Sequence, residues 1–182
     1  KIREVEGFKK KTEDNILEMI KQYEKSHERS LINNAMRKAE EIIEHMKDKD
    51  DNIRKIEYAG SLRRMKETIG DVDILCVSDD AKKTVKAFTK MPDVQRVVSK
   101  GDTRSSVVLQ EGISADLRIL EEKSYGSAMQ YFTGSKEHNI EVRKMARKKG
   151  YKLSEYGLFK SKGDKHVAGK SEKEIYKKLG MQ

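Results

Sequence analysis

Two carboxylates and a glycine-serine pair lie close together in residues 58–78, YAGSLRRMKETIGDVDILCVS. Asp71 and Asp73 open a run of apolar and β-branched residues after Gly70, which predicts a strand. Because side chains alternate along a strand, both carboxylates point to one face and the apolar residues between them to the other. Neighbouring carboxylates repel each other and are stabilised by a cation, and oxygen ligands suit a hard ion such as Mg²⁺.

The segment before this strand has the residue types that bind phosphate. Ser61 is predicted to cap a helix whose first backbone N–H groups are free, and two arginines, Arg63 and Arg64, follow it directly. Taken separately, the two features have simpler explanations, a solvated strand edge and an ordinary helix cap. Together, a phosphate cradle and metal-binding carboxylates indicate chemistry on a nucleoside triphosphate.

A third carboxylate lies in a later strand, residues 113–119, ISADLRI. Alternation predicts that the apolar residues of this strand share one face and that Asp116 and Arg118 share the other. An ion pair between these two side chains is one interpretation. The other is that Asp116 supplies the third carboxylate of a two-metal site from a neighbouring strand.

The composition favours a polyanionic partner. The 182 residues include 40 Lys+Arg and 31 Asp+Glu, a net charge of +9. The single cysteine, Cys76, excludes an internal disulfide, and the four histidines are too scattered for a zinc site. No apolar run reaches membrane-spanning length and no signal-peptide pattern opens the sequence, so we expect no membrane association. The expected location is the cytoplasm, in association with the nucleoid if the source is microbial.

Hydrophobic periodicity predicts alternating helices and strands. The expected helices cover residues 28–47, 81–89, 125–132 and 136–149 and a last segment behind Ser171, and the expected strands cover 53–58, 71–77, 94–98, 105–110, 113–119, 152–153 and 158–159. The helix at 136–149 has a narrow apolar seam and a strongly basic side. We expect that side to face solvent and to bind nucleic acid.

The first residues carry a separate candidate for DNA binding. Residues 5–9, VEGFK, resemble the hairpin of a helix-hairpin-helix motif, in which backbone amides hold a DNA phosphate. In that interpretation Gly7 forms the turn, and Lys9 and Lys10 add phosphate contacts. The alternative is a basic helix start with a run of lysines.

Three motifs in order resemble one family. The pattern G-S-x-R-R-x(5)-G-D-x-D at residues 60–73, ADLRI, and YFTGS followed by a basic helix and KLSEYGLF are similar to the X-family (polymerase beta-like) DNA polymerases of the nucleotidyltransferase superfamily. The resemblance implies an α+β fold with a palm of mixed sheet and flanking helices. It also implies a helical amino-terminal DNA-binding segment (1–50), the palm (51–123) and a small α/β thumb (124–182).

The same resemblance implies roles for individual residues. Asp71, Asp73 and Asp116 would hold two Mg²⁺ ions, with Mn²⁺ as an alternative, and Asp116 would bind the catalytic ion alone. The incoming nucleotide would be bound by Gly60, Ser61, Arg64, Gly70, Tyr131, Phe132, Gly134 and Asn139, with Arg29 as a further phosphate-binding candidate. The DNA would be contacted by Gly7, Lys9, Lys10, Arg118, Arg143, Arg147 and Lys148.

The expected function is therefore that of a monomeric DNA-directed DNA polymerase core. Its partners would be gapped or primed DNA and a deoxynucleoside triphosphate, and its reaction would fill short gaps during repair. One alternative is a nucleotidyltransferase that acts on RNA, a protein or a small molecule. Another is a DNA-binding module without catalytic activity, against which the intact set of three carboxylates argues.

Overall fold

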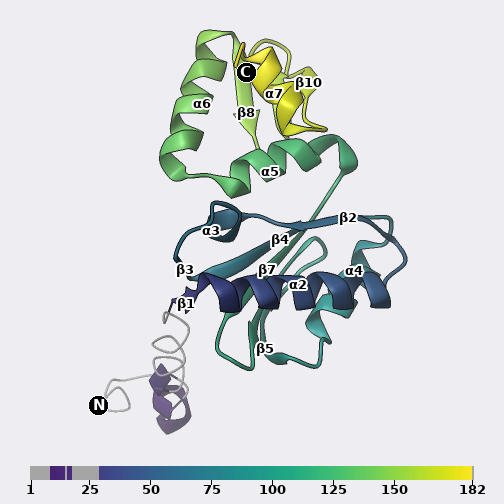
Figure 1. Ribbon diagram of the computed structural model, residues 1–182, viewed down its shortest axis with the longest axis vertical. Coiled ribbons are helices and arrows are strands. Elements are labelled where there is room, and N and C mark those ends of the chain that lie inside the picture. The colour runs from purple at the N-terminus through teal and green to yellow at the C-terminus, as the bar shows by residue number, and fades with distance from the viewer. Residues whose placement is uncertain (1–8, 15, 18–28, 182) are drawn as a thin grey trace.

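The computed structural model describes residues 9–14, 16–17 and 29–181 (Figure 1). Its centre is a five-stranded sheet in the order β2-β4-β7-β6-β5. The strands are β2 (Ile53–Tyr58), β4 (Asp71–Ser78), β5 (Val94–Lys100), β6 (Arg104–Leu109) and β7 (Ser114–Leu120). β4 and β7 run parallel and the other neighbours antiparallel, so the sheet is mixed as predicted.

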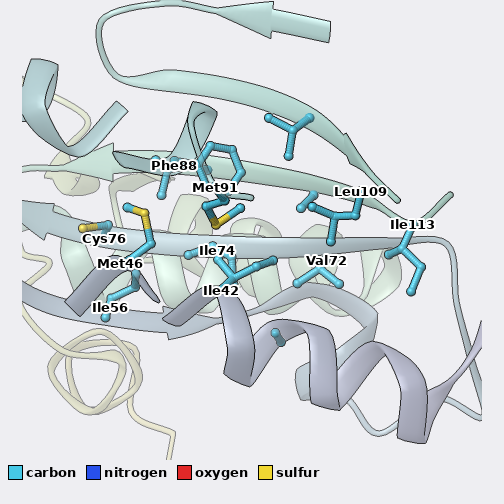
Figure 2. Close-up of a cluster of buried hydrophobic side chains, with 14 of the residues drawn as sticks. Ile42, Met46, Ile56, Val72, Ile74, Cys76, Phe88, Met91, Leu109 and Ile113 are labelled. Atoms are coloured by element: carbon cyan, nitrogen blue, oxygen red, sulfur yellow. The ribbon is translucent and has the colours of Figure 1, made fainter. Parts of the chain in front are cut away.

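Two helices cover one face of this sheet, α2 (Ile32–Lys49) and α4 (Ala81–Thr89). Between them and the strands lies a core that includes Met46, Val72, Ile74, Cys76 and Phe88, all with little or no exposed surface (Figure 2). The alternation predicted for β4 is therefore confirmed, because its apolar residues enter this core. Helix α2, which the sequence pattern placed in the amino-terminal segment, packs into the core of the sheet.

Helix α5 (Tyr125–Thr133) follows a short 3₁₀ turn, η2 (Glu122–Ser124), and lies on the opposite face of the sheet. There Ala128 and Met129 pack against Leu75, the β4 side chain that points away from the main core. The face that carries α5 is therefore also the face of Asp71 and Asp73, by strand alternation. Gly134 ends α5 with a φ of 67°, a backbone conformation that glycine adopts without strain.

Beyond α5 the chain forms a smaller α/β unit with its own core of Val142, Leu158, Ile175 and neighbouring apolar residues. It contains α6 (Lys136–Lys148), β8 (Tyr151–Ser154), β9 (Gly157–Lys160), β10 (His166–Ala168) and α7 (Glu172–Lys178), with the strands in the order β10-β9-β8. Strand β10 was not predicted, and neither was the pair β1 (Ser30–Leu31) and β3 (Thr68–Ile69). All three are too short to show a periodic pattern.

The first part of the chain is described only in pieces. Residues 10–14 and 16–17 are helical, and Lys9 and Lys10 are exposed. Gly7 lies outside the described residues, so the predicted hairpin remains a prediction. Among the helices that the structure describes, none is both long and apolar enough to cross a membrane.

Candidate active site

The three aspartates meet on one face of the central sheet. In the parallel ladder of β4 and β7, Asp73 lies directly opposite Asp116, and Asp71 opposite Ser114. Adjacent strands are about 4.8 Å apart, and residues two positions apart on one strand are separated by about 7 Å. Ala115 and Leu117 enter the main core, so Asp116 points to the opposite face together with Asp71 and Asp73.

This arrangement concentrates negative charge. Burial, followed by the charges of Asp71 and Asp116, raises the pKa of Asp73 from 3.8 to about 7. Desolvation, followed by the charge of Asp116, also raises the pKa of Asp71. A divalent cation would relieve both the repulsion and the desolvation, so the donor set suits a hard ion.

In the part of the chain that the structure describes, no three Asp, Glu, His or Cys side chains converge as a ready-made metal-binding group. Asp116 instead turns towards Arg104, whose Nη2 lies 3.8 Å from its Oδ2. Arg118 does not form the ion pair with Asp116 considered from the sequence, because its guanidinium lies 4.3 Å from the centre of the Phe132 ring. In this structure the charge of Asp116 is therefore balanced by a cation of the neighbouring strand β6.

The glycine-serine pair forms the short helix α3 (Gly60–Arg63), which the chain enters at Ala59. The prediction that Ser61 caps this helix is wrong, because Ala59 occupies the cap position and Ser61 lies inside the first turn. Gly60 has a φ of 62°, and a Cβ atom there would lie 2.1 Å from Asp73 Oδ2. Only glycine therefore lets α3 approach the carboxylates this closely.

Arg64 follows α3 and connects the two halves of the site. Its Nη1 donates a hydrogen bond to the carbonyl oxygen of Thr133, and its charge offsets a small part of the rise in the pKa of Asp73 that burial and the neighbouring carboxylates cause. Its Nε is buried and has no hydrogen-bond partner among the described residues. A buried, unpaired guanidinium N–H is suited to an anionic ligand such as a phosphate group.

Arg29 lies at the other side of the carboxylates. Its Nε donates to Thr68 Oγ1 at 2.8 Å and its Nη2 to the carbonyl oxygen of the same residue. The charge of Arg29 counteracts part of the rise in the pKa of Asp71 that burial and Asp116 cause, and its Nη1 would lie 3.3 Å from a Cβ on Gly70. The turn at Gly70 thus leaves room for a second cation beside the carboxylates.

A hollow of about 290 Å³ brings together most of the residues expected to bind the nucleotide. Its lining consists of Arg64, Tyr131, Phe132, Gly134, Ser135, Lys136, Asn139 and Arg143. Asn139 is held in place on two sides, because its Nδ2 donates to the carbonyl oxygen of Tyr131 and its Oδ1 accepts from Gln130 Nε2, both at 2.7 Å. The sequence interpretation missed Ser135 and Lys136 as lining residues, although Ser135 caps α6 and Lys136 is its first residue.

The predicted DNA-binding residues of α6 follow its exposed side. Arg143 lines the hollow, whereas Arg147 and Lys148 lie exposed in the last turn. Arg118, also predicted to contact DNA, lies against the ring of Phe132, one of the residues that line the hollow. The last residue of α3, Arg63, was not expected to link the two units, yet it donates to both carboxylate oxygens of Glu172 at 2.9 and 2.7 Å.

Comparison with known proteins identifies the same two units. The family model of the DNA polymerase beta palm matches residues 31–147, and that of the DNA polymerase beta thumb matches residues 128–182. The fold, and the sheet face that carries the three aspartates, thus define a nucleotidyltransferase palm joined to a thumb. The chain belongs to the X-family (polymerase beta-like) DNA polymerases, as its motifs indicated.

Individual relatives cover the chain to different extents. The DNA polymerase/3′-5′ exonuclease PolX of Bacillus subtilis is 35% identical over 183 residues, which are 100% of this chain and 32% of the relative. A repair DNA polymerase X of African swine fever virus is 35% identical over 130 residues, 67% of this chain and 74% of the relative. DNA polymerase lambda of Rattus norvegicus is 30% identical over 152 residues, 67% of this chain and 26% of the relative. The chain therefore spans about a third of the Bacillus relative.

Proposed function

We propose that this chain is the core of a DNA-directed DNA polymerase that fills short gaps in repair. The observation that carries the proposal is the register of β4 and β7, which sets Asp73 opposite Asp116. Arg64, whose charge acts on Asp73, also lines the hollow of about 290 Å³. Family membership and relatives named as repair polymerases support it. The acceptor would be the 3′ hydroxyl of a primer, and the donor a deoxynucleoside triphosphate.

The protein side chains would act mainly by positioning the nucleotide and neutralising its charge, as phosphoryl transfer requires. Gly60 and Ser61 would offer backbone N–H groups of the first turn of α3, and Arg64 would exchange Thr133 for a phosphate oxygen. Tyr131 and Phe132 would enclose the sugar at the end of α5. Asn139, fixed on both sides by hydrogen bonds, would present its amide to the edge of the base.

The carboxylates would hold the divalent ions on which this family depends. Asp71, Asp73 and Asp116 are the residues that would bind two Mg²⁺, or Mn²⁺ in its place, and bound ions would supply Lewis-acid assistance to the 3′ hydroxyl and the triphosphate. The carboxylate of Asp116 is the nearest of the three to the primer side in this interpretation. Its partner in this structure, Arg104, is mostly exposed and free to turn towards a DNA phosphate.

The structure also supports a division of the chain. We propose a palm that begins near Ser30 rather than after residue 50, because α2 shares the main core with the sheet. We propose that the thumb begins with α5 and contains the second core. DNA would lie along the exposed basic side of α6, through Arg143, Arg147 and Lys148, and we expect the chain to act as a monomer.

Primer extension on a single-nucleotide gap tests the proposal directly. Asp116→Asn keeps the shape of the side chain but removes its charge, so single-turnover extension should slow by about 10³-fold, about 4 kcal/mol of lost transition-state stabilisation. Folding, DNA binding and nucleotide binding should stay close to wild type. Asp51→Asn makes the same chemical change at an exposed turn of the palm and should extend normally.

Two outcomes would contradict the proposal. An Asp116→Asn protein that melts at a lower temperature but extends at the wild-type rate would show that the carboxylate is structural. A wild-type protein that transfers a nucleotide to RNA, a peptide or a small molecule but not to primed DNA would show that the acceptor is wrong.

A further inference from the structure

A second hollow, of about 260 Å³, lies between α6 and β8. Its lining residues are Ile140, Arg143, Arg147, Lys152 and Leu153. Arg143 also lines the nucleotide hollow, so the two hollows adjoin at this side chain. None of the five residues is acidic, and we call this site the α6–β8 groove.

The α6–β8 groove combines apolar surface with positive charge. Leu153 is 9% exposed and Ile140 is half-buried, whereas Arg147 and Lys152 are exposed. Within the described residues the guanidinium of Arg147 makes no hydrogen bond or ion pair, and Lys152 pairs with Asp164 at 3.0 Å on an open surface. Exposed ion pairs of this kind contribute little free energy, so Lys152 is available to another anion.

These two properties together suit one unpaired nucleotide. Proteins that hold single-stranded nucleic acid place the bases on flat or apolar side chains and track the phosphates with cations. Free phosphate would use the cations but not the apolar floor of Ile140 and Leu153. An apolar ligand would leave the cations without a partner.

The position of the α6–β8 groove indicates which DNA strand it would bind. Arg64, Asn139 and Arg143 line the same hollow. In the proposed function the triphosphate lies at Arg64 and the base at Asn139, so the pairing partner of the base would lie beside Arg143. The template strand therefore passes Arg143, and the α6–β8 groove begins at that residue. We propose that the groove binds the first unpaired template nucleotide beyond the templating base, with the base on Ile140 and Leu153 and the backbone phosphate between Arg147 and Lys152. This inference rests on the proposed polymerase function.

Fluorescence anisotropy with labelled primer–template DNA provides the test. One substrate has a 5′ template overhang of a single nucleotide, which is the templating base alone, and the other has an overhang of three. The wild-type protein should bind the longer overhang about tenfold more tightly at low salt. Arg147→Ala and Lys152→Ala should each remove most of that gain. Lys152 lies on β8, outside the DNA path proposed along α6, so Lys152→Ala should change the affinity for the short overhang by less than about twofold, whereas Arg147→Ala should weaken the binding of both substrates.

Matched controls distinguish binding in the α6–β8 groove from nonspecific attraction of DNA to positive charge. Lys144→Ala removes a cation from the same helix, but this lysine pairs with Glu141 and lies outside the groove lining, so the gain should persist. An abasic site at the second overhang position should reduce the gain without any change in the protein. 2-Aminopurine at that position should change its fluorescence with wild type and not with Ile140→Ser.

The outcomes distinguish this inference from the proposed function. Equal affinity of the wild type for both overhangs, or a gain that survives in both Arg147→Ala and Lys152→Ala, would overturn the groove assignment. If such a protein still extends primers, only the groove assignment fails. A wild-type protein that neither binds nor extends primed DNA refutes the polymerase function, and the groove assignment with it.

Discussion

Among the site residues, we expect ionised Asp73 to lower the free energy of unfolding the most. Its pKa in the native protein, about 7, exceeds the ordinary value of 3.8, which corresponds to a penalty of at most about 4 kcal/mol. Because the side chain keeps some contact with water, we expect about half of this, about 2 kcal/mol. Asp73→Asn should therefore make the metal-free protein more stable at pH 8.

The pH dependence follows from the sign of this shift. A carboxyl group with a raised native pKa binds its proton more tightly in the folded than in the unfolded state, so stability is lost as the pH rises from about 4 to about 7. The advantage of Asp73→Asn should be full above pH 7 and shrink to about 0.5 kcal/mol at pH 4.5.

Urea unfolding followed by circular dichroism, in the presence of a chelator, measures this difference at the two pH values. Asp51→Asn serves as the control, because the same substitution at an exposed turn should leave the midpoint unchanged. Adding millimolar Mg²⁺ should stabilise the wild type more than Asp73→Asn, since binding to the native state alone raises its stability. An Asp73→Asn protein that is less stable than wild type at pH 8 without metal would refute the reasoning.

Two further predictions concern the surroundings of α3. Met65 is exposed and has a φ of 56°, so Met65→Gly should relieve left-handed strain and raise the free energy of unfolding by about 0.5 kcal/mol after the entropy cost of glycine. A lower free energy of unfolding, measured with urea, would contradict this. The bidentate pair of Arg63 and Glu172 is half-buried, so a double-mutant cycle with Arg63→Met and Glu172→Gln should give a coupling energy of about 1 kcal/mol. A coupling energy of zero would mean that the pair does not hold palm and thumb together.

Local sequence patterns determined the identity of most elements and the faces of the key strands. The alternation in residues 71–77 placed Asp71 and Asp73 opposite the apolar side chains, and the structure confirms it because those side chains enter the main core. The same holds for Asp116 in β7. These predictions succeed because strand alternation is a local property that any half-buried strand obeys.

The sequence interpretation did not predict the very short strands, and it predicted the cap of α3 wrongly. β1 and β3 have two residues each and exist only because they pair with each other, as Ser30 does with Ile69, 39 positions further along the chain. Ser61 was predicted as a cap from its residue type, but the approach of α3 to Asp73 fixes the helix start at Ala59. In each case a contact distant in sequence overrides the local preference.

The assembly of the site itself depends on tertiary structure. The sequence supplied three aspartates on two strands, but only the parallel pairing of β4 with β7 sets Asp73 opposite Asp116. The ion-pair partner of Asp116 likewise comes from a third strand, as Arg104 on β6, while Arg118 stacks on Phe132 from α5. Pairing, register and side-chain partners arise from the burial of both faces of the sheet at once, and that balance is a property of the whole fold rather than of any one segment.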